Sequence, residues 1–216
     1  VLLENSFEST VNNNRIYGFN ETGILIDEST TEALITKNRI GAKDFSDDLE
    51  ESRGIGISVY GSNNTVGGSE GGTNTLVKNI FGGIKVFEGT GNKITFNHIY
   101  NNDTVVGKPD NFAIELINNG NIEKQKPTIV TYEELVPNKV FKIIGTALAG
   151  DSIHLYRAEG GYEDAVLYFA KGKTGADNKW EIEFNVKDFT IPLVNQTFTA
   201  VATATDANSN TSPLSD

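Results

Sequence analysis

The chain has 216 residues, which suits one large domain or two modest ones, with a formal net charge of −11 and no cysteine. The lack of cysteine excludes disulfide bonds, thiolate zinc sites and a cysteine nucleophile. An acidic chain with no basic cluster argues against nucleic acid as a partner, and without a window of about 18 apolar residues we expect no membrane span. Because it opens at Val1 with no signal-peptide pattern, we expect a piece of a longer protein.

Two short phrases recur through the first half of the chain. The first is Gly or Ala, then Ile, any residue and an aliphatic residue, and it returns about every 30 residues. It begins at Gly23, Gly56, Gly83 and Ala113. The second is Asn, any residue and an aliphatic residue, and it begins at Asn14, Asn38, Asn64, Asn74, Asn92 and Asn97. A repeat of this length is typical of solenoid proteins.

Each phrase predicts a short strand with one buried face, because apolar side chains fall at alternate positions. No phrase could bury its aliphatic side chains alone, whereas stacked coils would share one continuous core. We expect the asparagines to tolerate left-handed backbone at the corners and to form a hydrogen-bonded ladder from coil to coil. The glycine before the isoleucine would permit the bend between sheets. A sandwich of hairpins is the alternative, but it does not require both phrases to return in the same order.

Outward loops are predicted where the spacing between phrases exceeds one minimal coil. The largest covers residues 43–53, and two others cover 67–72 and 101–110. The repeat ends at 118–121, and 124–127 form a predicted linker. The solenoid is therefore predicted to occupy residues 1–123, with its first coil cut by the start of the chain.

The pattern changes after Pro127 to longer alternating runs separated by turn signals. The runs predict strands at 128–136, 139–147, 151–159, 165–170, 179–186 and 198–205. Strands at about ten-residue spacing are typical of an antiparallel β-sandwich of immunoglobulin-like type, here over residues 127–216. Trp180, Ile182 and Phe184 alternate along one run and are expected in its core.

Several stretches carry a family resemblance: Gly-Ile-Gly-Ile at 54–57, Asn-Thr-Val-Gly-Gly at 64–68 and Asn-Asn-Gly at 118–120. They resemble the parallel β-helix repeats of large bacterial surface and secreted proteins. The tail at 199–212 is similar to the last strand of the bacterial immunoglobulin-like modules that follow such helices. The resemblance implies an all-β chain, a right-handed parallel β-helix followed by an immunoglobulin-like β-sandwich, in an extracellular or cell-surface setting. It implies no single activity, because this fold carries enzymes, adhesins and stalks alike.

The carboxylate patterns of catalytic β-helices are missing from the predicted coils. Hydrolytic members carry clustered aspartates in Asn-Thr-Asp, Asp-Asp and Gly-His-Gly phrases, which supply acid and base on adjacent coils. Only Asp47-Asp48 matches, and it lies in a predicted loop. His98 and His154 have no nucleophile or second histidine beside them and are predicted to be surface residues. We therefore predict no catalytic and no cofactor-binding residue.

Two acidic segments are candidates for calcium, which prefers six to eight oxygen ligands. One is the loop after Lys43, for which a solvated insertion is the alternative. The other spaces its side-chain oxygens at alternate positions, and a hairpin turn explains it equally well. The candidate ligands are Asp44, Asp47 and Asp48 in the first segment and Asp206, Asn208 and Asn210 in the second. Calcium at the ends of such modules is what the resemblance to bacterial adhesin domains implies.

The sequence favours a non-enzymatic structural or adhesive segment of a large bacterial surface or secreted protein. The solenoid would be a rigid spacer, because its stability is a sum over neighbouring coils, and the sandwich a joint. The expected partners are neighbouring domains of the same polypeptide and surface glycans. One alternative is a polysaccharide lyase or hydrolase of acidic glycans that uses the loop after Lys43. Another is an accessory carbohydrate-binding region that works through Tyr60, Phe87 or Tyr100.

Overall fold

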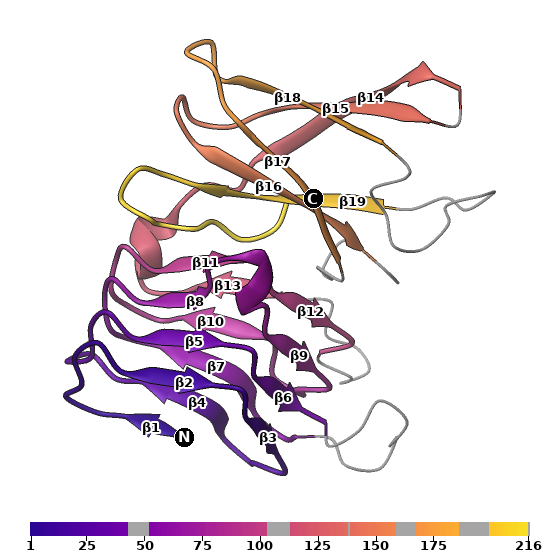
Figure 1. Cartoon of the computed structure of the whole chain (residues 1–216). Helices are drawn as coiled ribbons and strands as arrows, with labels where there is room; N and C mark the ends of the chain where they lie inside the picture. Colours follow the sequence, from indigo (N-terminus) through magenta and orange to yellow (C-terminus); the bar gives the residue numbers. More distant parts are fainter. Residues whose placement is uncertain (43–51, 103–112, 138, 159–166, 186–198, 216) are drawn as a thin grey trace.

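The computed structural model describes residues 1–42, 52–102, 113–137, 139–158, 167–185 and 199–215. The regular elements among these residues are strands, apart from two short 3-10 helices, η1 (Glu70–Gly72) and η2 (Gly120–Glu123). Figure 1 shows a stack of coils that runs up from the N-terminus and is covered at its top by two further sheets. None of the described helices has the length and apolar character that crossing a bilayer requires. The expected all-β fold is confirmed.

Parallel sheets form the walls of the solenoid, as the recurring phrases predict. The Gly-Ile phrases build the first sheet: β1 (Leu2–Leu3), β4 (Thr22–Ile26), β7 (Ile55–Val59), β10 (Ile84–Val86) and β13 (Ile114–Leu116). The second sheet contains β2 (Thr10–Asn12), β5 (Leu34–Thr36), β8 (Thr65–Gly67) and β11 (Lys93–Thr95). The third contains β3 (Arg15–Tyr17), β6 (Arg39–Gly41), β9 (Thr75–Val77) and β12 (His98–Tyr100).

The strand register of the first sheet stacks residues of the same type on one another. Ile24 pairs with Ile57, which pairs with Ile84, which in turn pairs with Ile114. All four side chains are buried in a single core cluster that runs the length of the solenoid. Each coil thus buries the aliphatic side chains of its neighbours, which no coil could do alone.

Glycine is required before these isoleucines for a reason other than the predicted bend. A Cβ on Gly23 would lie 2.7 Å from the carbonyl oxygen of Gly56, and one on Gly56 would lie 2.6 Å from that of Gly83. A Cβ on Gly83 would likewise lie 2.7 Å from the carbonyl oxygen of Ala113. The backbone of the next coil therefore excludes any side chain there. Ala113 precedes β13, which is the last described strand of its sheet, so no further described strand crowds its methyl group.

The predicted asparagine ladder is confirmed, but the asparagines of the recurring phrase divide between two ladders. The longer one joins Asn14, Asn38, Asn74 and Asn97 by side-chain amide hydrogen bonds of 2.9 to 3.1 Å. The other runs from Asn64 to Asn92, whose backbone N–H donates to the side chain of Asn121. Left-handed backbone lies one residue earlier than predicted, for example at Lys37 and Asn63. The six asparagines that begin the recurring phrases do not have positive φ, whereas Asn121 does.

Two antiparallel sheets follow the solenoid. One contains β14 (Thr128–Val136), β15 (Val140–Thr146) and β18 (Lys179–Asn185), and the other β16 (Ser152–Ala158), β17 (Leu167–Lys173) and β19 (Thr199–Thr205). The predicted strands agree within about two residues, except that β17 extends to Lys173. Gly172 lies opposite Ile153 there and leaves room for Ile182, so this glycine continues the strand instead of ending it. Trp180, Ile182 and Phe184 are buried as predicted.

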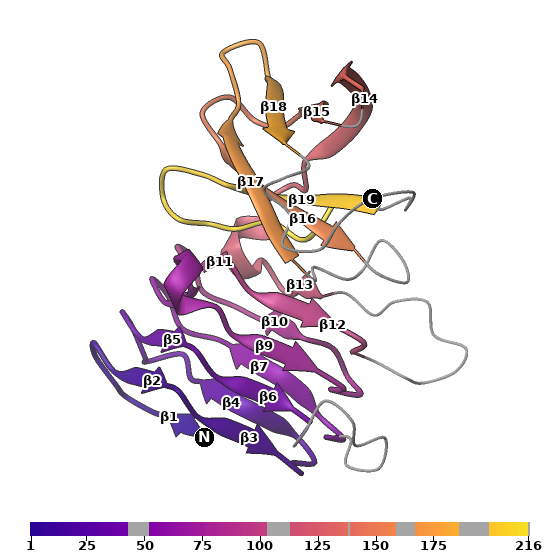
Figure 2. The same cartoon turned by 45° about the vertical axis from the view of Figure 1, so that its right-hand side comes forward.

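Strands β16 and β19 are buried on both faces of their sheet, whereas the alternating pattern of β16 predicts burial of one face only. Ile153 and Leu155 of β16 pack in the core of the sandwich with Trp180. The alternate residues Tyr156 and Ala158 belong instead to the core cluster of the solenoid. Figures 1 and 2 show β16 and β19 between the last coil and the sheet of β14, β15 and β18. The solenoid and the sandwich therefore share a core.

Side chains of the sandwich also cap the upper edge of β11, which is the last of the described strands in its sheet. The backbone N–H of Gly91 donates to Oδ1 of Asn210 at 2.6 Å, and that of Ile94 to Oγ1 of Thr211 at 3.0 Å. The N–H of Phe96 donates to the hydroxyl of Tyr156 at 3.1 Å. An edge strand that would otherwise expose unpaired donors is thereby satisfied.

The predicted linker is part of this junction. Lys124 is buried, and its Nζ lies 2.9 Å from Oδ1 and 2.8 Å from Oδ2 of Asp151, which is also buried. A buried ion pair fixes one geometry, because either charge without the other would be strongly disfavoured. The last solenoid strand ends at Leu116 and the first sandwich strand begins at Thr128. The predicted domain ranges 1–123 and 127–216 meet between these strands and stay a prediction.

Candidate binding cavity between solenoid and sandwich

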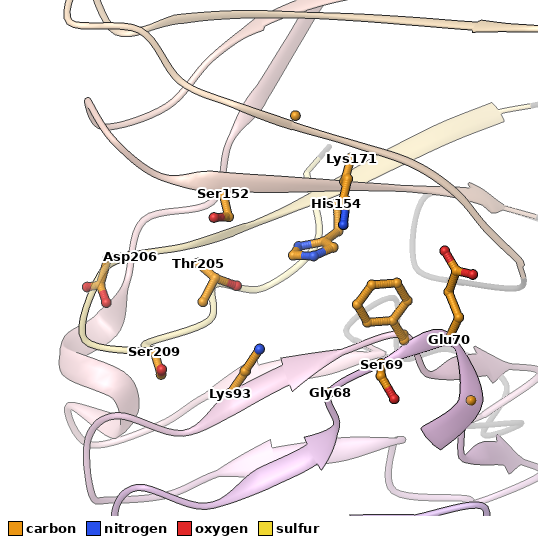
Figure 3. A pocket seen from close by; sticks show the side chains of 13 residues that line it. Gly68, Ser69, Glu70, Lys93, Ser152, His154, Lys171, Thr205, Asp206 and Ser209 are labelled. Carbon is orange, nitrogen blue, oxygen red and sulfur yellow. The ribbon is translucent and has the colours of Figure 1, made fainter.

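A cavity of about 620 Å³ lies where the sandwich meets the last coils. The solenoid contributes Lys93 of β11, Phe96 and the glycine-rich turn at 68–71. The sandwich contributes His154 of β16, Lys171 of β17 and the turn that follows β19. Figure 3 shows Lys93 rising from the solenoid while His154 and Lys171 descend from the sandwich. Its volume and its position between two modules are those of many ligand sites.

His154 is the central polar residue of the cavity. It was predicted to be a surface residue, and this is wrong: only 7% of it is exposed. The strand alternation does place His154 on the other face of the sheet from Ile153 and Leu155, as predicted. The solenoid, however, covers the face on which His154 lies. Its ring packs edge-on against Phe96, with centroids 5.2 Å apart. Within the described part of the chain, its Nδ1 is buried and has no hydrogen-bond partner.

Two lysines bring positive charge to the imidazole. Lys171 lies directly opposite His154 in the antiparallel pair of β16 and β17, so their side chains share one face of the sheet. Lys93 reaches the cavity from the solenoid side. Among the described residues, neither ammonium group has an ion-pair partner. Figure 3 shows the acidic side chains Glu70 and Asp206 at opposite ends of the cavity, with the two lysines between them.

The pKa of His154 is lowered from 6.5 to about 4, first by burial and then by the charges of Lys93 and Lys171. The imidazole is therefore neutral at pH 7. Tyr156 follows two residues later on the same face of β16 and is also buried. Burial raises the pKa of Tyr156 to about 12, which keeps its hydroxyl protonated.

This lowered pKa predicts a pH dependence of stability. The unfolded chain protonates His154 near pH 6.5, whereas the folded chain does so only near pH 4. As the pH falls from 6.5 to 4 the unfolded state binds the extra proton, so the free energy of unfolding decreases, by up to about 3 kcal/mol. Urea denaturation of the native chain and of His154→Gln at a series of pH values measures the difference, which isolates this group from titrating carboxylates. Equal slopes for the two proteins between pH 4 and 6.5 would contradict the prediction.

A comparison with known protein families matches residues 1–131 to the family described as "right handed beta helix region". The chain belongs to the right-handed β-helix family. The match covers the whole solenoid and reaches into β14. No curated protein matches the chain.

The second predicted calcium segment of this right-handed β-helix chain is a hydrogen-bonded turn. Oδ1 of Asp206 accepts the backbone N–H groups of Asn208 at 2.9 Å and of Asn210 at 3.0 Å. Oδ1 of Asn210 accepts the N–H of Gly91. Calcium at Asp206, Asn208 and Asn210 stays a prediction, and the ion would have to replace these bonds. The other predicted ligands, Asp44, Asp47 and Asp48, lie outside the described residues.

The aromatic residues proposed for sugar contact are not arranged as one open platform. Tyr60 and Phe87 lie on adjacent coils of the β-helix and stack face to face, with centroids 4.8 Å apart and ring planes 5° apart. Each ring therefore covers one face of the other, and both side chains are half-buried. Tyr100, in β12, is also half-buried. Sugar contact through these residues stays a prediction.

The cavity could not be predicted from the sequence, because the residues that line it come from distant segments of the chain. Lys93 precedes Ile94 in an Asn-x-Ile phrase, and nothing in that phrase distinguishes its lysine from other solvent-facing positions. His154 and Lys171 belong to different strands of the second half. The available signal was the alternation of His154 with Ile153 and Leu155, which placed the imidazole on the opposite face but did not say what covers that face.

Proposed function

We propose that this chain is a non-enzymatic structural or adhesive segment of a large bacterial cell-surface or secreted protein. The observation that carries the proposal is the burial of β16 and β19 on both faces, which joins the β-helix and the sandwich into one body. A spacer transmits position and force only if its modules do not swing freely about a linker. Here the core, the capped edge of β11 and the buried pair of Lys124 with Asp151 all resist such motion.

We assign the sandwich to the immunoglobulin-like modules. Its first, second and fifth strands form one sheet, and its third, fourth and sixth form the other. This division matches the A, B, E and C, F sheets of that fold if the fourth strand takes the place of C′, which lies in the C, F sheet of variable-type domains. In addition, residues 211–215 return along β19, where the N–H of Ser212 donates to the carbonyl of Ala204 and that of Ser215 to the carbonyl of Ala202. The segment takes the place of a final strand.

The setting that we propose is extracellular, with neighbouring modules of the same polypeptide and surface glycans as partners. The supports are the solenoid architecture, which gives length without a larger core, and the acidic, cysteine-free composition. A polysaccharide lyase or hydrolase is the competing function. Among the described residues, no group of three or more His, Cys, Asp and Glu side chains is placed to hold a metal ion.

Unfolding of the intact chain tests the proposal. Trp180 is the only tryptophan and lies in the sandwich core, so its fluorescence reports the sandwich, whereas far-UV circular dichroism reports all strands. We expect one transition in urea with coincident midpoints for both signals. Two separated transitions would contradict the single rigid body. If the chain instead releases reducing or unsaturated ends from polygalacturonate or a neutral β-glucan, the proposal that it is non-enzymatic is contradicted.

A further inference from the structure

We propose that the cavity between the modules binds an acidic sugar, a hexuronate unit whose carboxylate lies between Lys93 and Lys171 and accepts a hydrogen bond from Nε2–H of His154. The proposal rests on the structural and glycan-contacting function above and gives that contact a site and a ligand class. A volume of about 620 Å³ accommodates one or two sugar units.

The charge distribution selects an anion. Lys93 and Lys171 face the same cavity from opposite modules, and neither ammonium group forms an ion pair with a described residue. The carboxylate of Asp206 is already engaged, because it accepts two backbone N–H groups and the amide of Asn210. The lining as a whole holds two lysines and two carboxylates, but Glu70 and Asp206 lie at its opposite ends with the lysines between them (Figure 3). Positive charge is therefore concentrated in the middle of the cavity, where a ligand carboxylate would offset it.

His154 supplies a directed donor. Its Nδ1 is buried without a partner, and the residue lines the cavity, so Nε2 is the nitrogen that a ligand can reach. In the neutral ring only one nitrogen carries hydrogen, and a buried N–H without an acceptor is the rarer and more costly arrangement. The hydrogen therefore belongs on Nε2, where an anion would accept it.

The rest of the cavity suits a polyhydroxylated ring better than a phosphate. Ser152 and Ser209 offer hydroxyl groups that can donate or accept, and Phe96 offers an aromatic surface. Phosphate sites commonly use successive free backbone N–H groups. On β11 and its flanks, the N–H groups of Gly91, Ile94 and Phe96 already donate to side chains of the sandwich.

Calorimetric titration of the intact chain at pH 7 and low salt tests the site with D-glucuronate, D-glucose and inorganic phosphate. We expect glucuronate to bind at least about tenfold more tightly than glucose or phosphate. Lys93→Gln and Lys171→Gln should each weaken glucuronate binding at least about tenfold. Lys179→Gln is the matched control, since Lys179 is exposed on β18 outside the cavity, and it should leave the affinity unchanged.

The imidazole provides a second readout. A bound carboxylate offsets the charges of the two lysines, so the pKa of His154 followed by NMR should rise in saturating glucuronate and stay constant with glucose. Equal affinities for glucose and glucuronate, tighter binding of phosphate, unchanged affinity in both lysine variants, or no shift of the His154 signals would each overturn the proposal. Coincident unfolding is measured without ligand, so the rigid-body proposal and the cavity proposal fail separately.

Discussion

Replacing Asn74 by alanine is expected to lower the free energy of unfolding by about 3–5 kcal/mol. Asn74 is fully buried in the longer ladder. The Oδ1 of Asn74 accepts two hydrogen bonds from Asn38, one from its backbone N–H at 2.9 Å and one from its side-chain amide at 3.1 Å. Its Nδ2 donates to the carbonyl of Ile35 at 2.8 Å and to Asn97 at 2.9 Å. The truncation leaves several of these groups buried without partners, and each costs about 1–3 kcal/mol. Urea denaturation followed by circular dichroism measures the loss.

Asn14→Ala is the matched control for this variant. Asn14 occupies the exposed end of the same ladder and donates to the same atom of its neighbour, Oδ1 of Asn38. Water can replace its bonds, so the expected loss is at most about 1 kcal/mol. If Asn14→Ala and Asn74→Ala destabilise the chain equally, the ladder does not stabilise the β-helix through burial of its hydrogen bonds.

Replacing Tyr156 by alanine is expected to lower the free energy of unfolding by about 3–5 kcal/mol. The two modules are then expected to unfold in separate transitions. The side chain is 2% exposed and fills the contact between the sandwich and the last coil. Its hydroxyl also accepts the N–H of Phe96, which caps the edge of β11. In urea, the midpoint from Trp180 fluorescence and the midpoint from circular dichroism should no longer coincide.

Tyr156→Phe separates the two contributions of this residue. It keeps the packed ring and removes only the acceptor for the Phe96 N–H, so we expect a loss of about 1–2 kcal/mol with coincident midpoints. An alanine variant that behaves like the phenylalanine variant in both respects would show that packing at Tyr156 does not couple the modules.

The strands were predictable because their periods are local. Apolar alternation in Gly-Ile-x-Val and Asn-x-Ile fixes a short strand with one buried face, and the return of both phrases requires stacked coils. The sandwich strands carry the same kind of signal, and Trp180 lies in the core where its alternation placed it. The glycines at 23, 56 and 83 were predictable as special positions. The close approach of the next coil, which is their physical reason, was not.

Only the tertiary structure decided the features that depend on contacts between coils and between the solenoid and the sandwich. It separated one recurring asparagine phrase into two ladders, because Asn64 and Asn74 belong to different corners of the same coil. It also buried the polar face of β16, so that His154 changed from an expected surface residue into the centre of a cavity. The sequence by itself determined which face of a strand each side chain occupies, since that follows from a period of two residues. Only the packing of distant segments determined whether that face meets water, a neighbouring coil or a space for a ligand.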